Sequence, residues 1–212
     1  MSRKILERVP DEELQQDLEK YRQRAIELDA TDARTITSDM ILIDERVLAK
    51  CLNPKCPWYG TNINCPPYAT DLEQIRNTVN NFHYGILTMF KVPSEIVAGP
   101  HADINQRKRH LMKNHEIVSK IEAEAFYDGY HLAVGFAAGP CKPLFCPNNE
   151  CSALTPGQGC KHSLKVRHSM EGAGMDTYTM AARAGWDIYP IGKATPPSEV
   201  PHGTLVGLVL IY

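Results

Sequence analysis

The seven cysteines of this 212-residue chain are the feature that most restricts what it can fold into. They gather in two segments that are rich in Pro, Gly and Asn. The first thiol set is Cys51, Cys56 and Cys65, and the second thiol set is Cys141, Cys146, Cys151 and Cys160. Core cysteines behave as small hydrophobic residues and are expected among other apolar residues. An odd number of thiols in turn-forming segments instead predicts metal binding or redox chemistry.

The second thiol set follows the spacing Cys141-x4-Cys146-x4-Cys151-x8-Cys160. The intervening Pro and Gly residues supply the tight turns that bring four thiols to one site. Four thiolates bind either tetrahedral zinc or an iron–sulfur cubane. Structural zinc sites typically use two separated Cys pairs, whereas iron–sulfur proteins accept runs that contain a Cys-x4-Cys step. The spacing therefore favours a 4Fe–4S cluster, with zinc as the alternative.

The first thiol set, Cys51-x4-Cys56-x8-Cys65, is one thiol short of a cubane. Its fourth iron would take water, a substrate, a non-cysteine ligand such as His, or a protein ligand from elsewhere in the chain. In zinc enzymes an open position distinguishes catalytic from structural sites, and we extend this logic to iron. If the protein performs catalysis, we expect it at these three cysteines.

The apolar pattern predicts one α/β domain over residues 1–212, with a mixed or mostly parallel sheet, flanking helices and two metal-binding cysteine loops. The expected helices lie within 1–30, from the capping-box residue Thr70 onward, over 104–127 with His115 on the inner face, and over 176–184. The expected strands are 35–44, 84–92, 131–138 and 203–212. Residues 51–67 form the first cysteine loop and 139–162 the second. The order strand, long helix, strand over 84–138 predicts a parallel βαβ unit.

Charge and hydropathy limit the expected location and partners. The net charge of −2 gives no electrostatic case for a nucleic-acid or anionic-membrane partner. The N-terminal residues contain no apolar run of signal-peptide length, and no segment approaches the roughly 18 apolar residues of a membrane span. We therefore expect a cytoplasmic protein that meets a redox partner protein or a small-molecule substrate.

Two motifs carry a family resemblance. The run CPWYGTNINCPPY and the later run GPCKPLFC…CKHSLKVRHSMEGAGMD resemble the "predicted metal-binding protein" family (domain of unknown function twenty-two eighty-four), whose members look like Cys-rich iron–sulfur proteins. The resemblance extends from about Thr35 to the C-terminus. Ser163 and Gly172 stand where the family has Pro and Ala, and the second cysteine loop is more widely spaced. The resemblance implies metal binding and no particular reaction. The matching residues are Cys160, His162, Ser169, Met170, Glu171, Gly174, Met175 and Asp176.

Several functions fit these observations. The leading one is a redox protein with one or two 4Fe–4S clusters, which passes electrons to a partner or uses an open iron of the first thiol set. Catalysis would require a pocket near that set, lined by groups such as Tyr59, His162 or Glu171. Electron transfer requires a partner protein and no such pocket. The alternatives are a structural or regulatory zinc protein and a metal or cluster chaperone.

Overall fold

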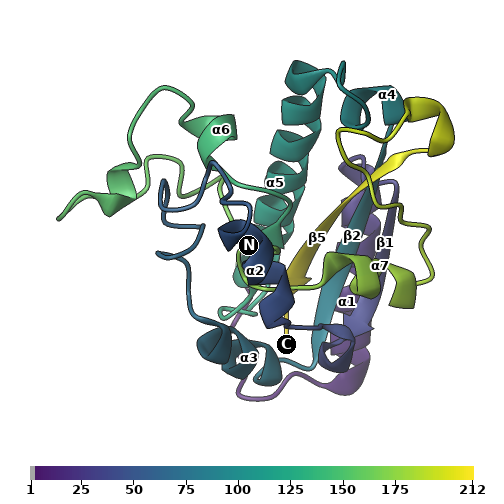
Figure 1. Ribbon diagram of the computed structural model, residues 1–212. Helices are drawn as coiled ribbons and strands as arrows, with labels where there is room; N and C mark the ends of the chain where they lie inside the picture. Colours follow the sequence, from purple (N-terminus) through teal and green to yellow (C-terminus); the bar gives the residue numbers. More distant parts are fainter. Residues whose placement is uncertain (1–2) are drawn as a thin grey trace.

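The computed structural model describes residues 3–212, and these form an α/β fold of three layers (Figure 1). A five-stranded mixed sheet, in the order β1-β2-β5-β3-β4, lies in the middle. The predicted fold class is thereby confirmed. The strands are β1 (Asp32–Thr37), β2 (Tyr84–Val92), β3 (Val134–Ala137), β4 (His168–Ser169) and β5 (Gly203–Leu210).

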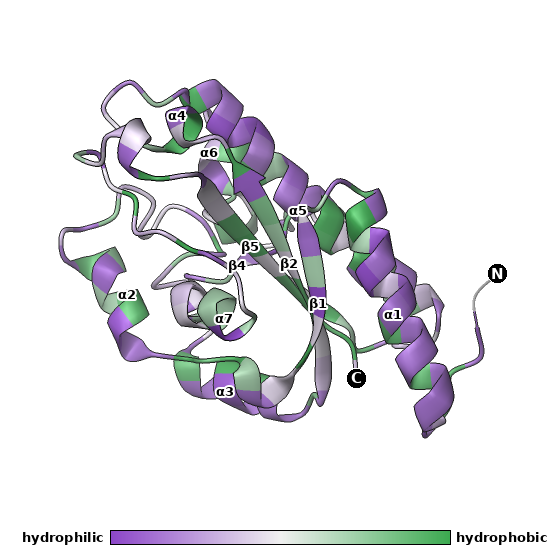
Figure 2. Ribbon diagram, turned by 90° about the vertical axis from the view of Figure 1, so that its right-hand side faces the viewer, coloured by the Kyte–Doolittle hydropathy of each residue, from purple (hydrophilic) through white to green (hydrophobic). Residues whose placement is uncertain are grey.

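Helices cover both faces of the sheet. Figure 2 shows α1 and α5 on one side and α3 and α7 on the other. None of the helices within residues 3–212 has the length and apolar content needed to cross a membrane. The α-helices are α1 (Asp11–Glu27), α2 (Glu45–Leu52), α3 (Leu72–Asn80), α4 (Ser94–Val97), α5 (Ile104–Tyr127), α6 (Lys142–Phe145) and α7 (Thr177–Arg183), and the 3-10 turns are η1 (Ser38–Met40), η2 (Ser152–Leu154) and η3 (Pro197–Glu199).

The hydrophobic core is divided in two by the sheet, because successive residues of a strand point to opposite faces. In β5, Val209 packs with residues of α1 and α5. Its neighbours Leu208 and Leu210 pack with residues of α3 and α7 on the other face. A strand that is buried on both faces must be apolar throughout, which explains the run GTLVGLVL.

The position of β5 corrects the predicted βαβ unit. Strands β2 and β3 run in the same direction, as predicted, but they are not neighbours. β5 lies between them and pairs antiparallel with both. Of the four pairings among the described strands, the β3–β4 pairing alone is parallel, so the sheet is mixed and a mostly parallel sheet was wrong. The last apolar segment of the chain takes the central position in the sheet.

Several predicted boundaries are confirmed. The strand 84–92 and the helix 104–127 have the predicted ends, and His115 lies on the buried face of α5. The predicted helix 176–184 corresponds to α7. Its N-cap carboxylate, Asp176, accepts a hydrogen bond from the backbone N–H of Thr179 at 3.1 Å. Gly185 follows with a φ of +77°, a left-handed conformation that ends the helix.

Other boundaries differ from the prediction. The strand expected over 35–44 ends at Thr37, where η1 begins, and the strand expected over 131–138 is limited to β3. The helix expected at Thr70 starts one residue later, because the Asp71 carboxylate caps it by accepting the Gln74 N–H at 2.9 Å. In the N-terminal segment 1–30, the helix begins at Asp11 after Pro10; residues 1–2 lie outside the described chain.

Helix α2 was not predicted, although it carries Cys51. The Asp44 carboxylate caps it by accepting the Arg46 N–H at 2.8 Å. The segment ERVLAKCL is amphipathic, but it is only eight residues long, and none of the residues in this described helix is fully buried. The first cysteine therefore lies in the last turn of a helix rather than in a loop.

Candidate metal centre

The second thiol set surrounds one small cavity. All four of its cysteines line a space of about 20 Å³, together with Phe145, Val166 and His162 from the same part of the chain. Asn62 and Asn64 of the first cysteine loop complete the lining. The loop leaves the sheet after β3 and returns at β4, so it lies at the carboxyl end of β3, as predicted.

Short turns fold the second thiol set inward. Pro143 occupies the first turn of α6, directly after Cys141, where a missing N–H costs nothing. The Lys142 Nζ donates to the Cys146 carbonyl at 2.8 Å and also contacts the Asn149 carbonyl. In the second half, the Ser152 hydroxyl donates to the carbonyl of Gly159 at 2.8 Å. These bonds close the loop on itself.

The thiols of this set influence one another electrostatically. Burial raises the pKa of Cys141 and of Cys146 above the ordinary thiol value, and the charges of the other thiols in the set raise both further. A hydrogen bond from Asn64 acts in the opposite direction on the pKa of Cys141. Because metals bind the thiolate, metal binding at this set must release protons.

The first thiol set is also held by turns. The backbone N–H of Cys56 donates to the carbonyl of Cys51 at 2.9 Å, and the N–H groups of Tyr68 and Ala69 both donate to the carbonyl of Cys65 at 3.1 Å. Cys65 is buried. Burial raises the pKa of its thiol to about 11, and the charges of Cys141, Cys56 and Cys51 add to that effect. The fold therefore brings the three thiols of this set into one neighbourhood.

The two thiol sets lie next to each other and share an asparagine bridge, Asn62 and Asn64. The Asn64 Nδ2 donates to the Cys141 Sγ at 3.5 Å, and the Cys141 Sγ in turn donates to the Asn62 Oδ1 at 3.5 Å. Asn62 is almost fully buried, and a hydrogen bond from its side chain lowers the pKa of Cys65. Figure 1 shows the first cysteine loop (blue) beside the second (green). The asparagine bridge contacts both sets.

The possible metal-ligand side chains of the described chain do not converge on the position of a single metal ion. Within residues 3–212, no three Cys, His, Asp or Glu side chains gather as closely as a single metal ion requires. The chemistry of the donors nevertheless suits a thiophilic metal group, because seven thiols occupy two adjoining sets.

His115 of α5 packs against residues of the second cysteine loop and the segment that follows it. The side chain is fully buried. Its Nδ1 accepts the backbone N–H of Arg167 at 3.2 Å, and its ring lies edge-on to Phe145 with 5.5 Å between centroids. The other ring nitrogen, Nε2, has no hydrogen-bond partner among the described residues, and the backbone of Gly139 lies close to the ring. His115 thus contacts both the beginning and the end of the loop, a role that its place on an apolar stripe did not reveal.

The stability of the fold is expected to decrease in mild acid because of His115. Burial, with a further contribution from the charge of Arg167, lowers its pKa from 6.5 to about 4. The folded protein therefore binds this proton less readily than the unfolded chain, so the stabilisation is complete above pH 6.5 and is lost as the pH falls toward 4. We expect the free energy of unfolding to fall by roughly 2 kcal/mol between about pH 7.5 and about pH 5.

Urea unfolding of the wild type and of a His115→Gln variant across this range measures the effect. The variant should lose this part of the pH dependence. His131→Gln, which changes an exposed histidine, is the matched control and should keep it. If the free energy of unfolding falls equally with decreasing pH in the wild type and in His115→Gln, His115 is not the source of the acid sensitivity.

The other histidines and Glu171 have different positions relative to the thiols. The backbone N–H of His162 donates to the Cys160 Sγ at 3.4 Å, so His162 adjoins the second thiol set. His168 Nδ1 lies 2.9 Å from the Ser169 carbonyl, and the His202 ring packs on Tyr189 with 5.5 Å between centroids. Glu171 accepts a hydrogen bond through its Oε2 from the Gly139 N–H at 3.1 Å, near the start of the second cysteine loop.

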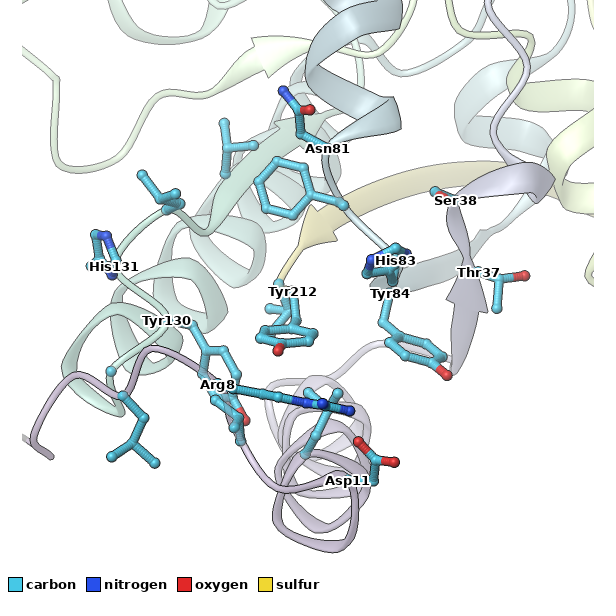
Figure 3. Close-up of a pocket in the computed structure, with 18 of the residues that line it drawn as sticks. Arg8, Asp11, Thr37, Ser38, Asn81, His83, Tyr84, Tyr130, His131 and Tyr212 are labelled. Atoms are coloured by element: carbon cyan, nitrogen blue, oxygen red, sulfur yellow. The ribbon is translucent and has the colours of Figure 1, made fainter.

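A large cavity lies away from the thiols. It has a volume of about 1190 Å³ and is formed by the N-terminal segment, the α3–β2 and α5–β3 connections and Tyr212 (Figure 3). Figure 3 shows Tyr84, Tyr130 and Arg8 around it, and His131 at its side. Its described lining contains none of the seven cysteines, and it contains neither Tyr59, His162 nor Glu171. A substrate bound there would not touch either thiol set.

Comparison with known proteins gives one family match. A family model described as "Predicted metal-binding protein (DUF2284)" matches residues 34–211. This range includes all seven cysteines and begins within β1, one residue from the start of the resemblance found in the sequence. No curated protein and no solved structure gives a significant match.

Proposed function

Since this chain belongs to the predicted metal-binding protein family DUF2284, we propose that it binds two 4Fe–4S clusters, one at each thiol set, and transfers electrons to a partner protein. The observation that carries the proposal is the cavity lined by all four cysteines of the second thiol set. When bound there, a cluster of this kind supplies one-electron redox chemistry. One cluster, at the second thiol set alone, is the more limited form of the proposal.

The cysteine spacing of the second cysteine loop and the open space at its tip support a cluster over a single zinc ion. The run of Cys-x4 steps differs from the paired cysteines of structural zinc sites. The cavity of about 20 Å³ holds little more than one water, so a larger group requires the loop to move outward. A Cβ added at Gly157 or Gly159 would meet no atom within 4 Å in the described part of the chain. The space around the tip of the loop is therefore open.

Neighbouring residues would tune the redox properties of this site. Phe145 and Val166 line the cavity with apolar surface, which limits access of water to the sulfurs. The Asn64 amide donates a hydrogen bond to the Cys141 sulfur. Such a bond favours the more electron-rich, reduced state and so raises the reduction potential.

Replacement of Asn64 should lower the potential of the second site. A hydrogen bond worth about 1 kcal/mol corresponds to roughly 40 mV for a one-electron couple. We therefore expect Asn64→Leu to lower the midpoint potential by roughly 40 mV in a redox titration followed by EPR. Asn148→Leu, at an exposed position of the same loop, is the control. An unchanged potential in Asn64→Leu, or an equal shift in both variants, would show that the bond has no such effect.

The surface around the thiol sets suits a negatively charged redox partner. Leu164 is 86% exposed and Leu52 is 57% exposed, so both sets have apolar side chains at the surface. The nearby Lys55, Lys161 and Lys165 are exposed as well. Exposed apolar side chains with lysines near them in the sequence complement an acidic partner. Catalysis on a small-molecule substrate has less support, because the large cavity in Figure 3 is lined by no cysteine in its described part.

Visible absorption distinguishes the cluster from the zinc alternative. The protein purified without oxygen should be brown, with charge-transfer absorption that dithionite bleaches and air restores at first. A zinc protein would be colourless and indifferent to dithionite. A cluster that passes rapidly to any apo-acceptor would instead favour the chaperone function. Colourless protein from cells supplied with iron would overturn the proposal.

A further inference from the structure

The turn from Ser169 to Gly174 holds Glu171 in a fixed position. The backbone N–H of Gly172 donates to the Ser169 hydroxyl at 2.8 Å, and the N–H of Ala173 donates to the Ser169 carbonyl at 3.0 Å. In the same turn, the side chains of Met170 and Ala173 are fully inaccessible to solvent. Glu171 is therefore a charged residue presented by an otherwise apolar, buried turn.

This turn is packed between the two cysteine loops. Its Met170 N–H donates to the Ala137 carbonyl at 2.9 Å, which ties the turn to the end of β3, where the second cysteine loop begins. On its other side, a Cβ added at Gly172 would lie 2.7 Å from the carbonyl oxygen of Asn64, the residue before Cys65. The backbone at Gly172 thus touches the first cysteine loop directly, and a larger residue would push the two apart.

The carboxylate of Glu171 lies between the two cysteine loops. Its Oε2 accepts the Gly139 N–H at 3.1 Å, and its charge contributes to raising the pKa of Cys51. Burial raises the pKa of Glu171 itself above the ordinary carboxyl value. No cationic side chain within residues 3–212 is among the groups that shift it. The side chain of Glu171 is half-buried, and a carboxylate in such surroundings is commonly paired with a cation or coordinates a metal.

We propose that Glu171 is the fourth ligand of the metal site formed by Cys51, Cys56 and Cys65, which it completes with a carboxylate oxygen. The assignment rests on the cluster binding proposed above. Three thiolates and one carboxylate give four donors, one for each iron of a cubane. A carboxylate is a harder ligand than a thiolate and holds iron less firmly, so the iron at Glu171 would be the exchangeable one.

Metal content and Mössbauer spectra of three variants test this assignment. Wild type, Glu171→Ala, Glu171→Gln and Glu171→Cys are loaded anaerobically with ⁵⁷Fe and sulfide. We expect about eight irons per wild-type chain, with one iron whose isomer shift is that of an oxygen ligand. Glu171→Ala and Glu171→Gln should lose that signal and at least one iron. Glu171→Cys should recover the iron with an all-sulfur spectrum. Glu150→Ala, at an exposed acidic residue of the second cysteine loop, should match the wild type.

The outcomes separate this assignment from the proposed function. Thermal unfolding of each variant identifies any that fails to fold. If Glu171→Ala does not fold, the isosteric Glu171→Gln still provides the test. If the wild type holds about eight irons and Glu171→Gln shows the same content and spectrum, Glu171 is not a ligand, while the cluster proposal stands. Failure of a folded Glu171→Cys to hold more iron than Glu171→Ala would also overturn the assignment. Zinc without sulfide in the wild type would instead overturn the proposed function itself.

Discussion

A Cys65→Ser variant purified without oxygen is expected to retain about half of the wild-type iron, about four atoms per chain in place of about eight. Cys65 is the buried member of the first thiol set, and its turn is closed by the N–H groups of Tyr68 and Ala69. Without its thiolate, two cysteines remain at that site, too few to hold a cubane. The second thiol set keeps all four cysteines around its cavity and should remain loaded.

The reciprocal variant, Cys151→Ser, is the matched control for this experiment. It removes one thiol from the second set and leaves the first set intact, so it should lose the other half of the iron. The EPR spectra of the two reduced variants should then differ and should each lack the spin interaction expected of two neighbouring clusters. Loss of all iron in either single variant would show instead that the two sets form one joint site.

Removal of the metal should make the second cysteine loop highly sensitive to protease. The loop tip around Gly157 and Gly159 contacts little else, and Lys161 and Lys165 are exposed nearby. Four bonds from cysteine to metal would cross-link this segment and suppress its local opening. If loading stabilises the closed loop by at least 1.4 kcal/mol, trypsin should cleave the metal-free chain there at least about tenfold faster.

Cleavage at Lys120 provides the internal control for the protease experiment. Lys120 lies within the regular helix α5 and forms an ion pair with Glu116 at 2.6 Å. Its cleavage should be slow with or without metal. Mass spectrometry of timed digests measures both sites in one sample. Equal cleavage rates in the loop with and without metal would contradict a metal-ordered second cysteine loop.

The sequence predicted the elements that have strong local signals. The strand 84–92 is apolar throughout and is followed by Pro93, and the helix 104–127 has a long apolar stripe, so both have the predicted ends. The grouping of the cysteines was equally visible, because the turns between them are encoded locally by Pro and Gly. The family match over residues 34–211 confirms the resemblance that these motifs carried.

Features that depend on distant contacts were not predictable in this way. The insertion of β5 between β2 and β3 is decided by which apolar strand can be buried on both faces, and no local pattern shows that choice. Helix α2 lacks a buried stripe. The asparagine bridge joins residues 77 and 79 positions apart, and His115 meets Arg167 across 52 positions. Such contacts arise only when the helices and loops assemble.

Iron, acid-labile sulfide and zinc per chain, determined together on wild-type protein purified without oxygen, test the central claim most directly. The fold places seven thiols in two adjoining sets, and the four thiols of the second set surround one cavity. Two cubanes predict about eight irons, about eight sulfides and no stoichiometric zinc. One or two zinc ions per chain with no sulfide would contradict the claim.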